Sequence, residues 1–246
     1  MAREYIARDP RTGERIGAKP KGTRKGIGIA ALYPDSGPWQ RLEPHEILPL
    51  ANGESGKVEI LADGRRWLLG RIDAIKALSR VPEKDAENAY DTLVDALEDD
   101  YPDVRIAALK TLPSFSLRRQ GILFHCLSDR LQDDEDSVRE EAMICLKKVA
   151  PLFPSGCEEI LRRELRDSRK DHRGNAFEAL KLASRDWPEV GCLHLDELIR
   201  EEEDDLRIRG SLILRTIASR GGAEAWDLIG WSLQDEEVRV RRNASK

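Results

Sequence analysis

Six arginines recur along the chain at a constant interval of 34 residues. They are Arg71, Arg105, Arg139, Arg173, Arg207 and Arg241, and no insertion interrupts the series. A row of guanidinium groups in one register is suited to binding a ligand, because each group presents a fork of donors that matches a carboxylate or a phosphate. The competing interpretation is structural, since charged groups in such a register are usually paired within the protein. The interval itself indicates a repeat architecture.

Acidic runs occupy the turns between successive repeats. They are Glu98–Asp100, Asp133–Asp136, Glu201–Asp205 and Asp235–Glu237. Stacked along one edge, these runs would form a negative rim that could bind a basic partner segment or cations. None of them has the D-x-[DN]-x-[DN]-G pattern of a calcium loop. We interpret the rim as a solvated edge that keeps the molecule soluble.

The N-terminal segment has the opposite charge. Residues 1–26 carry eight basic and three acidic side chains, a balance of +5 within a chain whose net charge is −5. Lysine and arginine interleaved with glycine and proline can follow a nucleic-acid backbone. The candidate phosphate contacts are Arg11, Arg15, Lys19, Lys21, Arg24 and Lys25. Two rival interpretations are solubility and docking of this arm onto the acidic rim of the same chain.

Other residue types give no pattern for catalysis. The four cysteines are Cys126, Cys145, Cys157 and Cys192, and they show no C-x-x-C spacing. We therefore interpret them as small buried core residues and not as a metal site or a disulfide. The chain has no G-x-S-x-G, Walker or H-E-x-x-H motif. We therefore predict no catalytic residue, no cofactor and no metal, and a protein that is not an enzyme.

Apolar residues follow the same 34-residue interval. A leucine stands seven residues after each of five arginines, and alanine or glycine stands three residues after it. A second apolar stripe lies 22 and 26 residues after each arginine: Leu93 and Leu97, Leu127 and Leu131, Leu161 and Leu165, Leu195 and Ile199, Ile229 and Leu233. Each interval thus predicts two amphipathic helices joined by a turn. Neither helix buries its stripe alone, so the repeats must stack on one shared core.

The D-x-V-R-x-x-A opening at Asp136–Ala142, followed four residues later by leucine and then by a second helix, resembles HEAT repeats of the short HEAT-like kind. The resemblance covers roughly residues 63–246. HEAT units usually run to about 40–47 residues and tetratricopeptide units to 34, but the tetratricopeptide and ankyrin signature residues are missing here. The resemblance implies an all-α, right-handed α-solenoid of the armadillo-like type, with about five helical-hairpin repeats and a partial sixth.

The same resemblance implies a structural role for the arginines. In such repeats an aspartate at the helix start and this arginine hydrogen-bond between adjacent units, and the matching aspartates are Asp103, Asp136, Asp171 and Asp205. HEAT-like hydroxylases hold iron with several His-Glu pairs. This chain has one, His45-Glu46, outside the repeats, so we reject an iron enzyme. Some HEAT-like folds act as DNA glycosylases or bilin lyases, but no residue set here supports either activity.

Two segments are expected. Residues 1–62 form a basic, largely extended arm with little regular structure, in which Pro44–Leu48 fits a short helix and Lys57–Leu61 alternates like a strand before an Asp63-Gly64 turn. Alternatively, Asp63 caps a longer first helix that runs through Trp67. Residues 63–246 form the solenoid. The sixth repeat stops at Lys246 within its first helix, so we expect a truncated sequence or an end that packs on another chain.

The chain has no apolar run near the roughly 18 residues of a membrane helix and no signal-peptide h-region, so the expected compartment is the cytoplasm. The predicted function is a non-enzymatic scaffold or adaptor that presents stacked helices to another protein, by analogy of fold. The alternative is an RNA- or DNA-associated protein that uses its basic arm. The identity of the partner is beyond the sequence.

Overall fold

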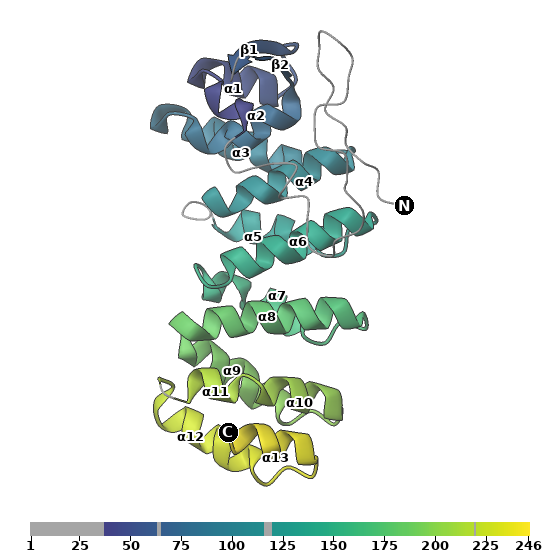
Figure 1. The fold of residues 1–246 in the computed structure, drawn as a ribbon, viewed down its shortest axis with the longest axis vertical. Coiled ribbons are helices and arrows are strands. Elements are labelled where there is room, and N and C mark those ends of the chain that lie inside the picture. The colour runs from purple at the N-terminus through teal and green to yellow at the C-terminus, as the bar shows by residue number, and fades with distance from the viewer. Residues whose placement is uncertain (1–36, 63–64, 116–119, 219) are drawn as a thin grey trace. The chain divides into compact units, whose positions relative to one another are not determined.

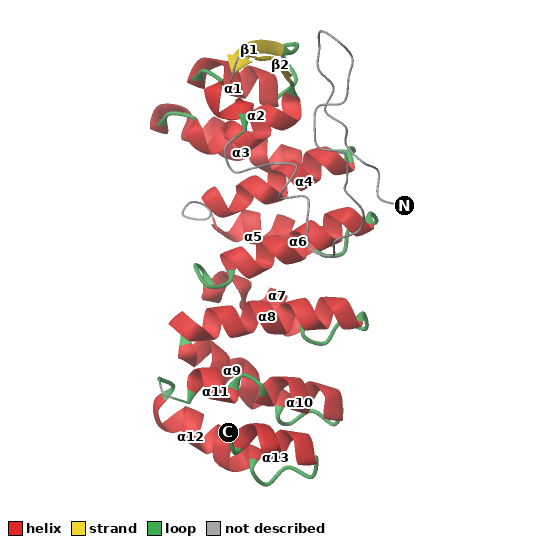
Figure 2. Ribbon diagram, viewed as in Figure 1, coloured by secondary structure: helices red, strands yellow, loops and turns green. Residues whose placement is uncertain are grey.

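The computed structural model describes residues 37–62, 65–115, 120–218 and 220–246 (Figure 1). Within these residues the secondary structure is helical except for one antiparallel hairpin of two strands (Figure 2). The predicted all-α class is therefore confirmed. The chain divides into two compact units, Met1–Thr111 and Leu112–Lys246.

The first unit is a group of packed helices with one strand hairpin. Its elements are η2 (Pro38–Arg41), α1 (Pro44–Ala51), β1 (Val58–Ala62), β2 (Arg65–Leu69), α2 (Arg71–Ala77), η3 (Leu78–Arg80), η4 (Glu83–Asp85), α3 (Ala86–Leu97) and α4 (Pro102–Thr111). Helix α1 packs against α2 and α3, and Ile47, Ile75 and Leu93 are completely buried. Proline begins α1, and the Glu43 amide donates to the Glu46 carboxylate at 2.9 Å, so the first turn of the helix is capped.

The strands β1 and β2 form a hairpin that corrects the predicted domain boundary. Ile60 lies opposite Trp67 in the antiparallel register, so Trp67 belongs to a strand and the alternative of a longer first helix is wrong. A boundary at residue 62 would cut this hairpin. Residues 44–62 contain a helix and a strand because Ile47 and Leu50 supply core to the first unit. Residues 1–36 of the predicted arm lie outside the described residues.

The second unit is a stack of helical hairpins. Its elements are η5 (Leu112–Ser114), α5 (Gln120–Arg130), α6 (Asp136–Val149), α7 (Pro154–Glu164), α8 (Lys170–Asp186), α9 (Pro188–Leu198), α10 (Asp204–Ser211), α11 (Leu214–Ile217), α12 (Gly222–Ser232) and α13 (Val238–Ala244). First helices pack on first helices, as α6 does on α8, and second helices pack on second helices, as α7 does on α9. This arrangement is an α-solenoid, as predicted (Figure 1).

The apolar stripes of the second helices are buried in the first three repeats, half-buried at Ile199 in the fourth and partly exposed in the fifth. The second-helix positions are 0% exposed at Leu93, Leu97, Leu127, Leu131, Leu161, Leu165 and Leu195. In α12, however, the buried residues are Ala225, Leu228 and Ser232, whereas Ile229 is half-buried and Leu233 is 45% exposed. The prediction of Leu233 as core is wrong because no later second helix in the described chain covers that side of α12.

Gly191 lets α9 approach two other helices closely. A Cβ placed on it would lie 2.6 Å from Ile217 Cγ2 and 2.6 Å from Ser184 Oγ. Alanine normally stabilises a helix interior by about 1 kcal/mol relative to glycine, but overpacking costs about 1–3 kcal/mol. We expect Gly191→Ala to lower the free energy of unfolding measured in urea.

Gly230 on α12 is the matched control, because a Cβ there meets no described atom within 4 Å. Gly230→Ala should raise the free energy of unfolding by up to about 1 kcal/mol. Equal changes of the same sign in the two variants would contradict the close approach at Gly191.

Candidate functional site

The arginine ladder binds main-chain carbonyls in both units. In the first unit the Arg71 Nε donates to Ala51 O at 2.9 Å, and the Arg105 Nη1 donates to Asp99 O at 2.6 Å. In the second unit each ladder arginine donates to the carbonyl six residues before it: Arg139 to Asp133, Arg173 to Asp167 at 2.7 Å, Arg207 to Glu201 at 2.8 Å and Arg241 to Asp235 at 2.7 Å. These bonds satisfy carbonyls of the inter-repeat turns and engage the guanidinium groups, which favours the structural role over a ligand-binding row.

A carboxylate that sequence reasoning missed joins some of these arginines to the next repeat. The Arg71 Nη1 lies 2.6 Å from the Asp99 carboxylate, and the Arg207 Nε donates to the Asp235 carboxylate at 3.0 Å. Both acidic residues follow their arginine by 28 positions. The same register holds an acidic residue in every repeat: Asp99, Asp133, Asp167, Glu201 and Asp235. The 34-residue interval was therefore a usable signal for this position.

The four aspartates expected at the helix starts have different surroundings. Asp205 reaches the preceding repeat through Oδ2, which lies 3.4 Å from Arg173 Nη2 and also 2.9 Å from Arg209 Nε of its own helix. Asp136 pairs with Arg139 within its own helix. Asp103 is half-buried in the first turn of α4, and Asp171 is exposed in the first turn of α8.

Ion pairs connect the exposed sides of α7 and α9. The Arg162 Nη2 lies 2.8 Å from Glu197 Oε1 and 3.1 Å from Glu158 Oε1, and the Arg166 Nη2 lies 2.7 Å from Glu201 Oε1. The hydrogen bond from Arg162 lowers the pKa of Glu197. Partly exposed pairs of this kind contribute at most about 1 kcal/mol each. These ion pairs form a surface network that links neighbouring second helices.

Three side chains with metal-ligand chemistry meet where α7 ends and α8 begins. One ligand atom each from Glu164, Asp167 and His172 lies within 4.8 Å of the others. Their carboxylates already accept hydrogen bonds, Glu164 from Arg163 at 2.9 Å and Asp167 from Arg169 at 2.7 Å. The hydrogen bond from Arg169 holds the pKa of Asp167 well below its usual range. Both carboxylates are thus engaged by guanidinium groups, and the structure shows an ion-pair cluster.

The cysteines have the environment of apolar core residues. All four are free and buried. Burial raises the pKa of the Cys157 thiol to about 12 and raises that of Cys145 further. Thiols with such pKa values are not nucleophiles at neutral pH, because the thiolate is the reactive form.

His194 on α9 is a buried histidine without a hydrogen bond. It is 1% exposed, and neither ring nitrogen has a partner among the described residues. Burial lowers the pKa of the imidazole below its ordinary 6.5; Arg162 and Arg166 act in the same direction, and Glu197 and Glu158 oppose them. The ring is therefore neutral in the folded chain at neutral pH.

This burial predicts a loss of stability in mild acid. Below about pH 6.5 the unfolded chain protonates His194 while the folded chain does not, so the free energy of unfolding falls by up to about 1.4 kcal/mol per pH unit. The fall continues until the pH reaches the lowered folded pKa. His194→Leu should flatten this dependence in urea titrations at several pH values. His125→Gln is the control, because His125 is 76% exposed; a slope unchanged by His194→Leu would contradict the assignment.

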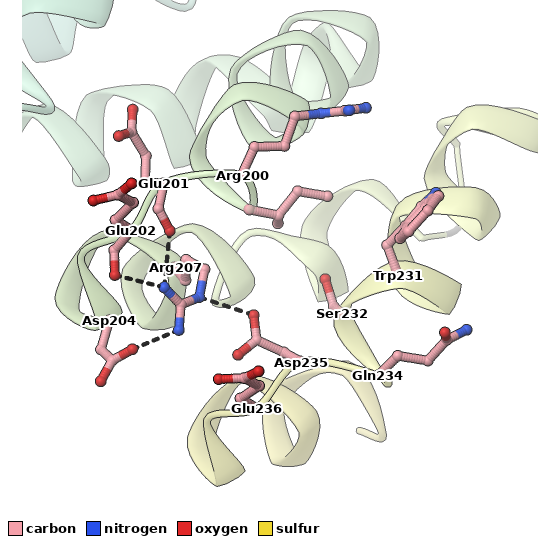
Figure 3. Close-up of a pocket in the computed structure, with 11 residues that line it drawn as sticks. Arg200, Glu201, Glu202, Asp204, Arg207, Trp231, Ser232, Gln234, Asp235 and Glu236 are labelled. Atoms are coloured by element: carbon pink, nitrogen blue, oxygen red, sulfur yellow. Dashed lines mark hydrogen bonds and ion pairs between the residues drawn. The ribbon is translucent and has the colours of Figure 1, made fainter.

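One pocket of about 690 Å³ opens in the second unit where α9, α10, α12 and the turn before α13 meet (Figure 3). Arg207 lies within it and is held by Asp204, Asp235 and the main chain. The remaining lining residues are Ile199, Arg200, Glu201, Glu202, Trp231, Ser232, Gln234 and Glu236. The pocket thus combines carboxylates with an indole ring, a set suited to a cationic ligand.

The other predicted residues do not meet at this pocket. The candidate phosphate contacts Arg11, Arg15, Lys19, Lys21, Arg24 and Lys25 lie outside the described residues. His45 is exposed on α1, and the carboxylate of its neighbour Glu46 caps that helix. None of the described helices is long and apolar enough to cross a membrane.

The stacked hairpins with arginine-capped turns settle the type of architecture. The chain has the architecture of HEAT-like repeat proteins. No protein-family model matches it, and no curated protein matches it. An archaeal HEAT-like repeats protein from Thermococcus onnurineus aligns with 14% identity and a TM-score of 0.44 over 82% of this chain and 78% of its own.

Two further solved structures are similar at the same low level. A computationally designed armadillo repeat protein for modular peptide recognition aligns with 17% identity and a TM-score of 0.41, over 82% of this chain and 97% of its own. A chain from the structure of Kap95p bound to RanGDP aligns with 15% identity and a TM-score of 0.48, over 88% of this chain and 31% of its own. At these identities the similarities assign no function to this HEAT-like chain.

Proposed function

We propose that this HEAT-like chain is a non-enzymatic scaffold that binds another protein through its stacked helices. The observation that carries the proposal is a set of three large apolar side chains that α12 leaves exposed, Trp226, Trp231 and Leu233, which we together call the outer face of α12. These side chains are 65%, 66% and 45% exposed. Single exposed apolar residues are common, whereas several large ones on one short element are typical of interaction sites.

The position of this helix explains why its outer face is exposed. Residues at the register of Leu233 are 0% exposed at Leu97, Leu131 and Leu165 and half-buried at Ile199. Helix α12 packs against α9, α11 and α13, and no described element buries Trp226, Trp231 or Leu233. Tryptophan offers a large contact area at a low entropic cost and is enriched at the energetic centres of interfaces. This supports a protein surface as the ligand.

The proposal is tested by placing a photo-reactive phenylalanine analogue at position 226 of the full chain and irradiating cells of the source organism. We expect a discrete protein adduct. The same analogue at position 140, where Glu140 is exposed on α6, is the control and should give none. Identical adducts at both positions, or no protein adduct at position 226, would contradict the scaffold.

The alternative function is nucleic-acid association through the basic arm, and the charge of +5 over residues 1–26 favours it. Nuclease treatment of the irradiated sample separates the two functions. Adducts that vanish with nuclease, and also vanish when Lys19, Lys21, Arg24 and Lys25 are replaced by glutamine, would establish the alternative instead.

A further inference from the structure

The pocket of the second unit has two carboxylates that its own arginines do not neutralise. Arg207 is held by Asp204 and Asp235, and Arg200 is engaged by Asp196 at 2.6 Å outside the pocket. Glu201 is paired with Arg166 across to α7. Glu202 and Glu236 remain, and neither side chain has a hydrogen bond or an ion pair with any described residue. Both are exposed, so they are free to meet a cation.

These two carboxylates occupy one register in consecutive repeats. Glu236 follows Glu202 by 34 residues, and each comes directly after an acidic residue that is already paired, Glu201 and Asp235 respectively. An extended segment that spans these two repeats would therefore meet one free carboxylate in each of them. That geometry suits a chain with repeated positive charges better than a single small cation.

The rest of the pocket suits the non-charged parts of lysine or arginine. Trp231 is 66% exposed at its edge, and Ile199 supplies an apolar wall. An aromatic face attracts a guanidinium or an ammonium group, while the methylene stem packs on apolar surface. The Ser232 hydroxyl is 1% exposed and has no hydrogen-bond partner among the described residues, and Figure 3 shows it pointing into the space between Arg207 and Trp231. It leaves one polar group at the pocket floor available to a ligand.

We propose that this pocket binds an extended, arginine- or lysine-containing segment of a partner protein. The cationic groups meet Glu202 and Glu236, and one of them stacks on Trp231. This inference rests on the proposed scaffold function and names the chemistry of its partner. Trp231 belongs to both surfaces, so a partner that contacts Trp231 also reaches the pocket.

The test is a titration of the full chain with a short fluorescein-labelled peptide of alternating arginine and glycine, followed by fluorescence anisotropy. The dissociation constant should rise about 3- to 10-fold in the double variant Glu202→Gln and Glu236→Gln, because two partly screened ion pairs are lost. It should rise about 3-fold or more in Trp231→Ala. Added salt should weaken binding, since the carboxylates are exposed.

Matched variants separate the pocket from general charge. The double variant Glu203→Gln and Glu224→Gln removes the same charge from exposed residues that do not line the pocket, and Tyr101→Ala removes a similarly exposed aromatic ring that belongs to neither binding surface. Both controls should bind the arginine peptide like the parent chain. A glutamate–glycine peptide should not bind. Equal weakening in the pocket variants and the controls would overturn the proposal.

Two further outcomes also decide against it. If the peptide binds only after Lys19, Lys21, Arg24 and Lys25 are replaced by glutamine, the occupant is the chain's own arm and not a partner. If the peptide fails to bind while the protein adduct at position 226 persists, the proposed scaffold function is retained and the proposed binding of a basic segment is rejected. Loss of the adduct at position 226 would instead remove the scaffold function itself.

Discussion

Replacing Arg173 by alanine should lower the free energy of unfolding of the chain by about 2–4 kcal/mol, since hydrogen bonds from a charged donor contribute about 1.5–3 kcal/mol each and this side chain makes two of them to the main chain. The side chain is 10% exposed and donates to Asp167 O at 2.7 Å and to Ser168 O at 3.2 Å. Both carbonyls belong to the turn before α8. Urea unfolding followed by circular dichroism at 222 nm, the usual helix wavelength, measures the change.

Arg173→Lys and Arg200→Ala are the controls for this experiment. Lysine keeps the charge but lacks the planar fork, so Arg173→Lys should recover only part of the stability. Arg200 is 67% exposed and pairs with Asp196, so its removal should cost less than about 1 kcal/mol. If Arg173→Ala and Arg200→Ala gave equal losses, the ladder arginine would be a surface charge and not a structural cap.

The second large effect is expected at Leu165, where alanine should cost about 2–5 kcal/mol by leaving a cavity. Leu165 is 0% exposed at the end of α7, in the stripe shared with the neighbouring second helices. The loss is measured as a shift of the urea midpoint at unchanged slope.

Leu233 provides an internal reference because it occupies the same register 68 residues later and is 45% exposed. Leu233→Ala should change the free energy of unfolding by less than about 1 kcal/mol. A large loss at Leu233 would mean that the outer face of α12 is buried in solution, for example by self-association, and sedimentation of the parent chain would reveal that state.

The repeat itself was predictable because its determinants are local. Five of the six ladder arginines bind the carbonyl six residues earlier, and the buried leucines follow them at constant offsets. Periodicity alone therefore indicated helices, stacking and much of the core. The acidic register that contains Asp99 and Asp235 is equally visible in the sequence. The prediction instead chose the aspartates at the helix starts, such as Asp103 and Asp205.

Other features depend on packing that an offset does not encode. Leu165 and Leu233 are identical in type and register, yet one is buried and the other exposed, because burial depends on whether a further helix follows. Residues 44–62 lack the repeat, yet they fold as part of the first unit because Ile47 and Leu50 are buried in its core. The pocket as a whole could not be predicted from the sequence. The 34-residue interval puts Glu202 and Glu236 on one edge, but only the packing of α12 brings Trp231 to them.

The arginine contacts also determine how such a chain can change its length. Arg207 reaches back six residues to Glu201 and forward 28 residues to Asp235, and these two distances add up to one repeat. Loss of residues 174–207 would join Arg173 to Ile208, and Arg173 would then keep its own turn and inherit Asp235 as its forward partner. Duplication of the same 34 residues would also leave the spacing of these contacts unchanged. Gene rearrangements that add or remove whole repeats therefore preserve the backward and forward contacts of each ladder arginine. Insertions of other lengths preserve the backward contact when they lie in the turn between the two helices of a hairpin.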